Sequence, residues 1–329
     1  MARSDASIGE FELIAKYFAP LGNIANSETQ SRINLGIGDD AALLNPRKDH
    51  QLAISVDTLV AGVHFPVGGD ARLIAHKALR SNLSDLAAMA ATPLAYTLAL
   101  TLPALDEPWL ANFSEGLREI AEEFQITLIG GDTTRGAQLV ITIQIIGEVP
   151  TGKALTRSGA QPGDIIFVTG TLGDARAALD ILAVPQDRAT TEQQYLLDRY
   201  YRPTPRLSFA QTLRGIATAA IDISDGLAAD LGHILKASGV GAEVRLMQLP
   251  LSDALLNLTN AHQYALSGGD DYELCFTAAP EHAEKIQALS TQAATRVTEI
   301  GRITENSGLV VRDINGKQIA LTDTGYTHF

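Results

Sequence analysis

The sequence predicts a two-domain protein of the α/β or α+β class. Its 329 residues exceed what one compact core usually organises, so two cores are expected. Apolar segments of strand length alternate with segments of helical periodicity through both halves of the chain. Apolar residues make up 46% of the chain and charged residues 19%, without a biased tract, which is typical of a folded protein. We place the domain boundary near residue 150, giving domains 1–150 and 151–329.

The first domain is predicted to combine amphipathic helices with apolar strands. The longest helical pattern is followed by Thr92-Pro93, which is expected to end it, and Pro108 opens the next helix. The expected elements are helix 8–18, a glycine-rich turn at 36–40, strand 52–56, helix 70–90, strand 95–102, helix 108–124, strand 126–129 followed by Gly-Gly-Asp, and strand 139–149.

The second domain repeats this alternation after a polar loop at residues 157–164. Its expected elements are strand 165–168, helix 174–182, helix 205–217, strand 219–223, helix 227–238 and strand 274–277. The single cysteine, Cys275, lies in the last of these apolar strands. It is therefore expected to be a buried packing residue.

Charge and hydropathy exclude several classes of partner. The formal net charge of -13, without a Lys/Arg-rich run, argues against nucleic acid. No apolar stretch approaches membrane-spanning length, and the N-terminus lacks the apolar region of a signal peptide. We therefore expect a cytoplasmic protein with no membrane partner.

Aspartates beside glycines or at the predicted ends of apolar strands are the main indication of function. They are Asp39, Asp40, Asp57, Asp132, Asp222, Asp225, Asp270 and Asp271. A further acid, Asp85, lies among apolar residues of a predicted helix, where burial would require a partner. Converging carboxylates need positive charge between them, which several Mg²⁺ ions would supply. Any one of these residues alone is more simply a turn former, but their recurrence after strands favours a metal site.

The signature motifs of common nucleotide folds and hydrolases are missing from the sequence. There is no P-loop, and Gly36-x-Gly38 lacks the third glycine of a dinucleotide fingerprint. The segment 130–134 (GGDTT) can offer N–H groups to phosphate, and Lys153 and Arg157 lie on a loop suited to holding a nucleotide. The histidines lack zinc spacing; a Ser-His-Asp triad stays open, but no Gly-x-Ser-x-Gly turn marks a nucleophile. The residues alone indicate a metal-dependent phosphate enzyme.

Nine ordered motifs, which cover nearly the whole chain, resemble those of bacterial thiamine-monophosphate kinase. They are GIGDDAAL, SVDTLVAGVHF, KALRSNLSDLAAMAATP, GGDTTRG, LTRSGAQPGD, RPTPR, DISDGLAADL, SGGDDYEL and GYTHF. The resemblance implies a two-domain aminoimidazole-ribonucleotide-synthetase-like fold, in which N-terminal sheets join in a barrel across a homodimer and the C-terminal domain covers the active-site cleft. It also implies phosphoryl transfer from ATP, the co-substrate, to thiamine monophosphate, assisted by several Mg²⁺ ions.

The same resemblance assigns site residues motif by motif. It implies magnesium ligands at Asp40, Ser55, Val56 (through its carbonyl), Asp57, Asp85, Asp132, Asp222 and Asp225. It implies ATP contacts at Gly131, Asp132, Arg157 and Ser224, and thiamine monophosphate contacts at His64, Asp270 and Tyr326. The family usually has Glu where this chain has Asp270, so this carboxylate reaches one methylene less. No catalytic base is expected, because the attacking phosphate oxygen is already ionised near neutral pH.

Two alternatives remain open on the sequence. One is another ATP-dependent synthetase of the same superfamily, of the aminoimidazole ribonucleotide or selenophosphate type. The selenophosphate type normally needs a reactive Cys or selenocysteine near the N-terminus, whereas the only cysteine here is Cys275. The other is a non-catalytic metal-binding protein, which predicts cation-dependent melting without ATP turnover.

Overall fold

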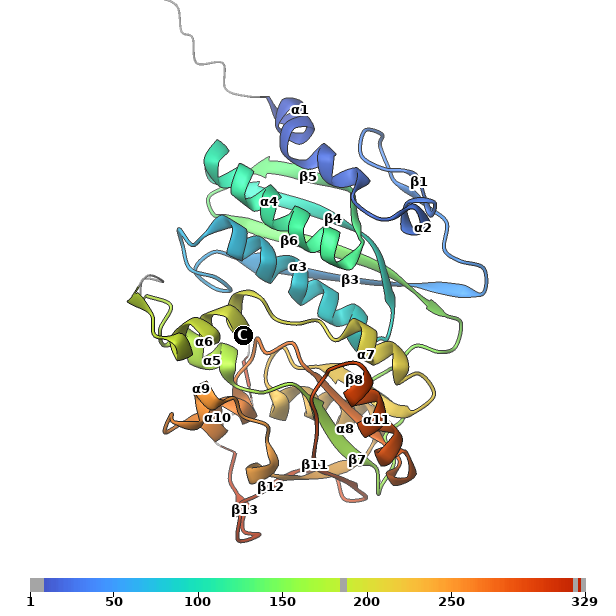
Figure 1. Ribbon diagram of the computed structural model, residues 1–329, viewed down its shortest axis with the longest axis vertical. Coiled ribbons are helices and arrows are strands. Elements are labelled where there is room, and N and C mark those ends of the chain that lie inside the picture. Colours follow the sequence, from blue (N-terminus) through green and yellow to red (C-terminus); the bar gives the residue numbers. More distant parts are fainter. Residues whose placement is uncertain (1–8, 184–187, 322–324, 327–329) are drawn as a thin grey trace, which may run out of the picture. The chain divides into compact units, whose positions relative to one another are not determined.

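The computed structural model describes residues 9–183, 188–321 and 325–326. The chain divides into two compact units, each with its own main sheet (Figure 1). Unit 1 comprises Met1–Asn82 and Pro93–Glu148, and unit 2 comprises Leu83–Thr92 and Val149–Phe329. The mixed two-domain class predicted from the sequence is therefore confirmed.

Unit 1 is built on a four-stranded sheet in the order β3-β6-β4-β5. Its strands are β3 (His50–Val60), β4 (Thr92–Leu102), β5 (Thr127–Arg135) and β6 (Val140–Pro150). Strands β1 (Ile33–Leu35) and β2 (Leu43–Leu44) form a separate two-stranded antiparallel sheet, and Ile33 and Leu44 pack against buried residues of the four-stranded sheet. The N-terminal helical segments are α1 (Glu10–Leu13), the π-helical η1 (Ile14–Phe18), η2 (Ala19–Asn23) and α2 (Ser27–Gln30).

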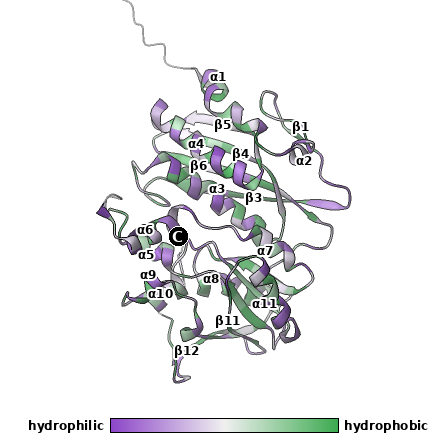
Figure 2. Ribbon diagram, viewed as in Figure 1, coloured by the Kyte–Doolittle hydropathy of each residue, from purple (hydrophilic) through white to green (hydrophobic). Residues whose placement is uncertain are grey.

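Two long helices, α3 (Ala71–Ala88) and α4 (Glu107–Phe124), run along the four-stranded sheet (Figure 1). The α4 helix begins one residue before the predicted Pro108, because the Asp106 carboxylate caps it by accepting a hydrogen bond from the Trp109 N–H at 3.0 Å. Its apolar stripe, which includes Phe113 and Leu117, is fully buried. Figure 2 shows hydrophilic and hydrophobic residues mixed along α4, as an amphipathic helix requires.

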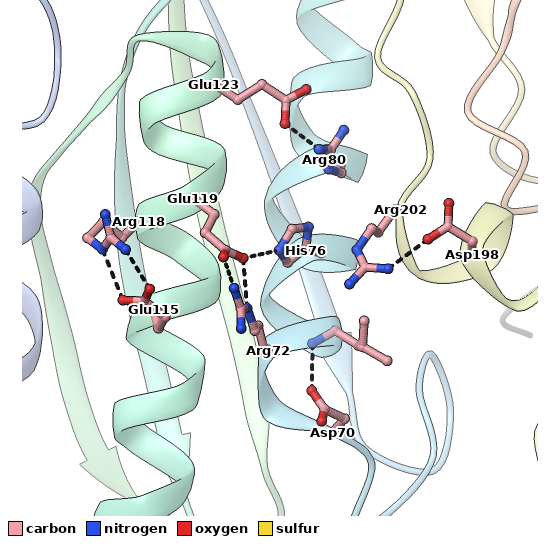
Figure 3. A network of polar contacts seen from close by, with 11 residues as sticks. Asp70, Arg72, His76, Arg80, Glu115, Arg118, Glu119, Glu123, Asp198 and Arg202 are labelled. Carbon is pink, nitrogen blue, oxygen red and sulfur yellow. Dashed lines mark hydrogen bonds and ion pairs between the residues drawn. The ribbon is translucent and has the colours of Figure 1, made fainter. Parts of the chain in front are cut away.

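Polar contacts and close packing join α3 to α4 (Figure 3). The Glu119 carboxylate accepts a bond from Arg72 Nε, and His76 Nε2 lies 2.8 Å from the same carboxylate. Partly exposed ion pairs contribute only about 0–1 kcal/mol each. Steric contact limits the distance between the two helices more strictly, since a Cβ atom at Gly116 would lie 2.7 Å from the Arg72 carbonyl oxygen. Glycine at this position lets the two helices approach.

Unit 2 is built on a seven-stranded sheet in the order β13-β12-β9-β11-β7-β10-β8. Its strands are β7 (Ile165–Thr169), β8 (Ala217–Asp222), β9 (Gly241–Arg245), β10 (Leu274–Ala278), β11 (Val297–Thr304), β12 (Gly308–Arg312) and β13 (Gln318–Ile319). Neighbouring strands are antiparallel except β9 and β12, which are parallel. The rings of Phe167 and Phe276 stack across the buried centre with their centroids 5.2 Å apart.

Helices complete unit 2. They are α5 (Asp174–Leu179), α6 (Thr191–Tyr201), α7 (Leu207–Thr212), α8 (Leu227–Ser238), α9 (Asp253–Leu256), α10 (Ala261–Ser267) and α11 (Ala283–Gln292), with short 3₁₀ turns η4 (Leu246–Gln248) and η5 (Pro280–His282). Cys275 is buried in β10 as expected, and burial raises the pKa of its thiol.

The described ranges contain no helix with both the length and the apolar character that crossing a bilayer requires.

Some predicted boundaries are wrong. The helix predicted at 205–217 is the much shorter α7, which ends at Thr212; after it the chain turns at Gly215, which has φ 74° in the left-handed region, before β8 begins. The strand predicted at 52–56 extends over the whole of β3. In the described part of the single chain neither main sheet closes on itself, since β3 and β5 are the two edges of the unit 1 sheet.

Candidate active site

The predicted site residues fall into two groups, one in each unit. Unit 1 contains Asp40, Ser55, Val56, Asp57, His64, Gly131 and Asp132. Unit 2 contains Asp85, Arg157, Asp222, Ser224, Asp225, Asp270 and Tyr326.

A pocket of about 440 Å³ opens beside the glycine-rich loop of unit 1. Asp39, Asp40 and Asp132 form its acidic part, and Gly130 and Gly131 present backbone to it. The apolar part of the lining consists of Phe11, Ile14, Phe18, Ile37, Leu98 and Leu128. An apolar wall with a few polar groups is the usual form of a small-molecule site. The fold thus brings Asp40 and Asp132 to one pocket although they are distant in sequence.

The two aspartates of the glycine-rich loop differ in their contacts. The Asp39 carboxylate accepts a hydrogen bond from the Asp40 N–H at 2.9 Å, which is a local turn contact. Both side chains are exposed at the pocket, but the Asp39 carboxylate is engaged in this turn contact. Asp39 therefore orders the loop, and Asp40 is the better placed of the two to meet a ligand.

The Gly130-Gly131-Asp132 segment lies inside strand β5. The expectation that Asp132 follows the end of its strand is wrong, because β5 continues to Arg135. Gly131 lies opposite Leu98 of the parallel neighbour β4, and a Cβ atom at Gly131 would lie 1.9 Å from the Leu98 carbonyl oxygen. Strand packing alone therefore requires glycine at this position.

Three further predicted ligands lie in the middle of strand β3. The expectation that Asp57 ends a strand is also wrong, since β3 continues to Val60. Because side chains alternate along a strand, Ser55 and Asp57 share one face and are partly buried. Val56 projects from the other face with 56% of its surface exposed. Its predicted role needs only the carbonyl, so this exposure does not contradict it.

His64 lies in the tight turn that follows β3. Its own N–H donates to the Val60 carbonyl at 2.9 Å, and its Nδ1 accepts a bond from the Val60 N–H at 3.0 Å. Because a backbone N–H can only donate, Nδ1 carries no proton and the neutral ring is protonated at Nε2. The turn therefore orients the imidazole with Nε2 as its donor atom.

In unit 2, Asp222 is the last residue of strand β8, one residue before the predicted end of that strand. Its Oδ2 accepts a hydrogen bond at 2.7 Å from the hydroxyl of Ser84, and both residues are buried. Asp85 is the residue after Ser84 in α3. The expectation that Asp85 is buried is only partly right: Leu83 and Ser84 take the buried positions, and Asp85 is half-buried.

Backbone hydrogen bonds join three segments of unit 2 that are distant in sequence. The Ser224 carbonyl accepts from the Asp270 N–H at 2.8 Å, and the Asp225 carbonyl accepts from the Tyr326 N–H at 3.0 Å. Gly325 adopts φ 140°, and a Cβ there would lie 2.7 Å from the Asp225 carbonyl oxygen. Four predicted contact residues, Ser224, Asp225, Asp270 and Tyr326, are thereby gathered at one place.

The loop that carries Asp270 is conformationally strained. Asp270 and Tyr272 have φ values of 68° and 50°, a region that a bulky side chain rarely adopts. Two backbone bonds hold the strain: Tyr272 N–H donates to Ile223 and Ile223 N–H donates to Glu273, both at 2.8 Å. The Tyr272 hydroxyl also lies 3.1 Å from Asp270 Oδ1. Strain held this way is typical of functional loops.

Sequence reasoning misses Asp230, in the first turn of α8. Its Oδ2 accepts hydrogen bonds from the N–H groups of Ser224 (3.0 Å), Asp225 (3.0 Å) and Gly226 (3.1 Å). Burial raises the pKa of Asp230 to about 7, and the three donors oppose that shift. The sequence feature that could have indicated this role is an acidic residue in the first turn of a helix that follows a Ser-Asp-Gly turn.

Sequence reasoning also misses a buried ionic network around Glu273. Glu273 is fully buried and accepts from Thr169 Oγ1 (2.7 Å), Arg199 Nη2 (2.9 Å) and Arg206 Nε (2.6 Å). Arg206 is the last residue of the RPTPR motif, so part of that motif has a structural role. Burial also raises the pKa of Asp271 well above its usual range, although the N–H of Gly173 donates to its carboxylate.

Arg157 is exposed on a loop that the far end of α8 holds. The Ser238 hydroxyl oxygen lies 3.2 Å from both the Gly159 and the Ala160 N–H groups, from which it accepts hydrogen bonds. The side chain of Arg157 is thus presented to solvent from an ordered loop, as a phosphate-binding guanidinium would need to be.

The predicted ligands fit magnesium by their donor chemistry. All are oxygen donors: carboxylates, one hydroxyl and one backbone carbonyl, which suit Mg²⁺ and not zinc. Among the residues that the structure describes, no three acidic, histidine or cysteine side chains converge as a ready-made metal cage. Mg²⁺ does not require one, because it commonly uses one or two carboxylates with water and phosphate oxygens.

Two domain families match the chain. Residues 38–149 match the AIR synthase related protein, N-terminal domain, and residues 161–314 match the C-terminal domain of the same group. The chain is therefore an AIR synthase related protein, a class defined by this pair of domains. Within the class it belongs to the thiamine-monophosphate kinase family, as the following similarities show.

Thiamine-monophosphate kinase of Salmonella typhimurium is 49% identical over 327 residues, which cover 98% of each chain. The crystal structure of thiamine-monophosphate kinase from Stenotrophomonas maltophilia K279a has a TM-score of 0.82 and 47% identity, covering 88% of this chain and 93% of that one. The structure of AaThiL complexed with AMPPCP and TMP has a TM-score of 0.77 and 32% identity, covering 98% and 97%. The family resemblance predicted from the motifs is confirmed.

Proposed function

We propose that this protein is a kinase that transfers the γ-phosphoryl group of ATP to the phosphate of thiamine monophosphate. The products are thiamine diphosphate and ADP. The observation that carries the proposal is the 49% identity, over 98% of both chains, to a protein named thiamine-monophosphate kinase. The structural match to AaThiL, complexed with a nucleotide analogue and TMP, supports the same activity.

The reaction needs positioning and charge neutralisation more than acid–base chemistry. An oxygen of the acceptor phosphate attacks the γ-phosphorus, and the bond from that phosphorus to the leaving ADP oxygen breaks. The attacking oxygen is already ionised near neutral pH, so no side chain has to remove a proton. Mg²⁺, when bound, supplies the positive charge that offsets repulsion between the two polyanions.

We assign the magnesium ligands as the sequence predicts them. They are Asp40, Ser55, the Val56 carbonyl, Asp57 and Asp132 in unit 1, and Asp85, Asp222 and Asp225 in unit 2. Gly131, Asp132, Arg157 and Ser224 contact ATP. The exposed Arg157 guanidinium can form paired hydrogen bonds to phosphate oxygens. Residues 1–150 then form the domain for ATP and Mg²⁺ binding and for dimerisation, and a cytoplasmic location fits the use of ATP.

A coupled assay for ADP with purified protein tests this function. ADP release is expected only when ATP, Mg²⁺ and thiamine monophosphate are all present. Thiamine itself is the matched control, because it has the same rings but no acceptor phosphate, and it should give no ADP. Magnesium-dependent melting without ADP release would instead establish the non-catalytic alternative.

We propose that His64, Asp270 and Tyr326 contact the acceptor. The acceptor combines an anionic phosphate with a cationic ring system. An imidazole donor suits the phosphate, and a carboxylate with an aromatic face suits the cation. Asp270 and Tyr326 are both bonded to the Ser224-Asp225 segment, and the Tyr326 side chain is 49% exposed and accessible to a ligand.

Tyr326→Ala is expected to raise the KM for thiamine monophosphate roughly tenfold and to leave the KM for ATP nearly unchanged, as loss of a cation–π contact predicts. Tyr326→Phe keeps the aromatic face and should behave like wild type. Asp270→Glu should stay active, although the left-handed backbone at this residue makes it less stable by about 1 kcal/mol. Steady-state kinetics decide: an unchanged acceptor KM in Tyr326→Ala would place the acceptor elsewhere.

We also propose that the protein is a homodimer formed through the open face of the unit 1 sheet. Leu52, Ile54 and Val56 project from one face of the edge strand β3 and are 41%, 57% and 56% exposed. A row of exposed apolar side chains on an edge strand is usually covered in the functional protein. The same face of a second copy, packed against this row, would cover it and would bring the two sheets together as the predicted barrel requires.

Light scattering at micromolar concentration is expected to give the mass of a dimer. Ile54→Lys places a charge in the apolar row and should give a monomer. Ile314→Lys is the control, since Ile314 is 77% exposed in unit 2, and this variant should stay dimeric. A monomeric wild-type protein, or a dimer that both substitutions leave intact, contradicts the assignment of this face.

A further inference from the structure

We propose that Asp230 is a positioning residue for phosphoryl transfer, whose carboxylate fixes the backbone of residues 224–226 so that Ser224 and Asp225 face their ligands. The inference rests on the proposed function, because that function assigns ATP to Ser224 and magnesium to Asp225. It adds a residue to the site that has no direct contact with substrate.

The hydrogen bonds of this loop converge on one atom of Asp230. Three consecutive N–H groups, those of Ser224, Asp225 and Gly226, donate to the single Oδ2 atom of Asp230 at 3.0, 3.0 and 3.1 Å. Successive N–H groups that point to one spot form an anion-binding concavity, which in other proteins holds phosphate. Here an internal carboxylate occupies it. The loop therefore meets ATP and metal with its side chains and not with these N–H groups.

The carbonyl groups of the same loop are fixed as well. Ser224 O accepts from the Asp270 N–H and Asp225 O accepts from the Tyr326 N–H. Asp230 thus holds the donors of the loop while the two acceptor-site segments hold its carbonyls. Release of the donors would free the peptide units that anchor Asp270 and Tyr326. Asp230 therefore links the ATP and magnesium residues of unit 2 to its acceptor residues.

A carboxylate suits this position better than an amide. Asp230 is only 2% exposed, so its three donors have little water to replace a lost acceptor. A carboxylate oxygen is a stronger hydrogen-bond acceptor than an amide oxygen. Asp230→Asn keeps the size and one acceptor oxygen and should be intermediate, whereas Asp230→Ala removes the acceptor entirely.

Amide hydrogen exchange tests the positioning without metal or nucleotide. In Asp230→Asn, the amides of residues 224–226 should exchange at least about tenfold faster than in wild type, because their acceptor is weakened. The amides of the adjacent strand β8 should be unchanged. Asp253→Asn is the matched control, since Asp253 is an exposed acid in the first turn of α9 and should alter neither set.

Kinetics test the functional consequence. In Asp230→Asn, kcat/KM for ATP should fall by about tenfold and the Mg²⁺ concentration for half-maximal rate should rise; in Asp230→Ala both effects should be larger. Wild-type exchange in Asp230→Asn would overturn the positioning role, and so would faster exchange with wild-type kinetics. If wild type releases no ADP with thiamine monophosphate, the proposed function fails, and the exchange result still decides whether Asp230 holds the loop.

Discussion

Asp132→Asn is expected to abolish phosphoryl transfer while the protein stays folded. Asp132 lies in β5, lines the pocket with Asp39 and Asp40, and has an exposed side chain, so the amide disturbs no packing. The substitution removes one negative charge where a metal ion and ATP are proposed to bind. Metal-assisted charge stabilisation contributes several kcal/mol, which corresponds to a rate loss of at least about a thousandfold. ADP release under saturating substrates is the measurement.

The same substitution at Asp57 and Asp85 should have the same effect. Asp106→Asn is the matched control in unit 1, because it also removes one charge but keeps the helix cap of α4, which Asn serves equally well. It should turn over like wild type. Wild-type turnover in two of the three variants Asp57→Asn, Asp85→Asn and Asp132→Asn would refute the magnesium assignment.

Regular local patterns explain which elements the sequence predicts well. The apolar stripe of α4 repeats at helical spacing behind Asp106 and Pro108, and α8 is predicted with its observed bounds. Helix α6 is not indicated, although Thr190 and Gln193 form its capping box, because its buried side chains cluster in its C-terminal half. Strand β11 carries charged residues between its apolar positions, which weakens its alternation.

Site residues are predictable by type but not by placement. Asp57 and Asp132 are recognisable from their motifs, yet both lie inside strands and not after them. Asp132 lies inside β5 because Gly131 pairs with Leu98 of the neighbouring strand β4. This pairing cannot be recognised from the local sequence. The role of Asp230 depends on a three-way contact that only the folded loop creates. Tertiary contacts here override what turn-forming residues indicate locally.

Glu273→Gln is expected to lower the free energy of unfolding by about 3 kcal/mol or more. The side chain of Glu273 is fully buried, and those of Arg199 and Arg206 are 11% and 16% exposed. Removing one partner of a buried ion pair typically costs about 3–5 kcal/mol, because the remaining charges lose their counterion away from water. Denaturant unfolding measures this loss: the midpoint should move to a lower denaturant concentration, and the dependence of the free energy of unfolding on denaturant concentration should not change.

The exposed ion pair between Glu299 and Arg302 is the control that distinguishes the effect of burial from the effect of removing a charge. Glu299 lies 3.2 Å from Arg302 with both side chains more than a third exposed, so Glu299→Gln should cost less than about 1 kcal/mol. The buried substitution should also disturb the acceptor loop, because the Glu273 carbonyl accepts from Ile223, the residue before Ser224. Equal losses in the two variants would mean that the buried network contributes no more than a surface pair. Strain at Asp270 and Tyr272 would then have to be held by the backbone bonds to Ile223 and Ser224 alone.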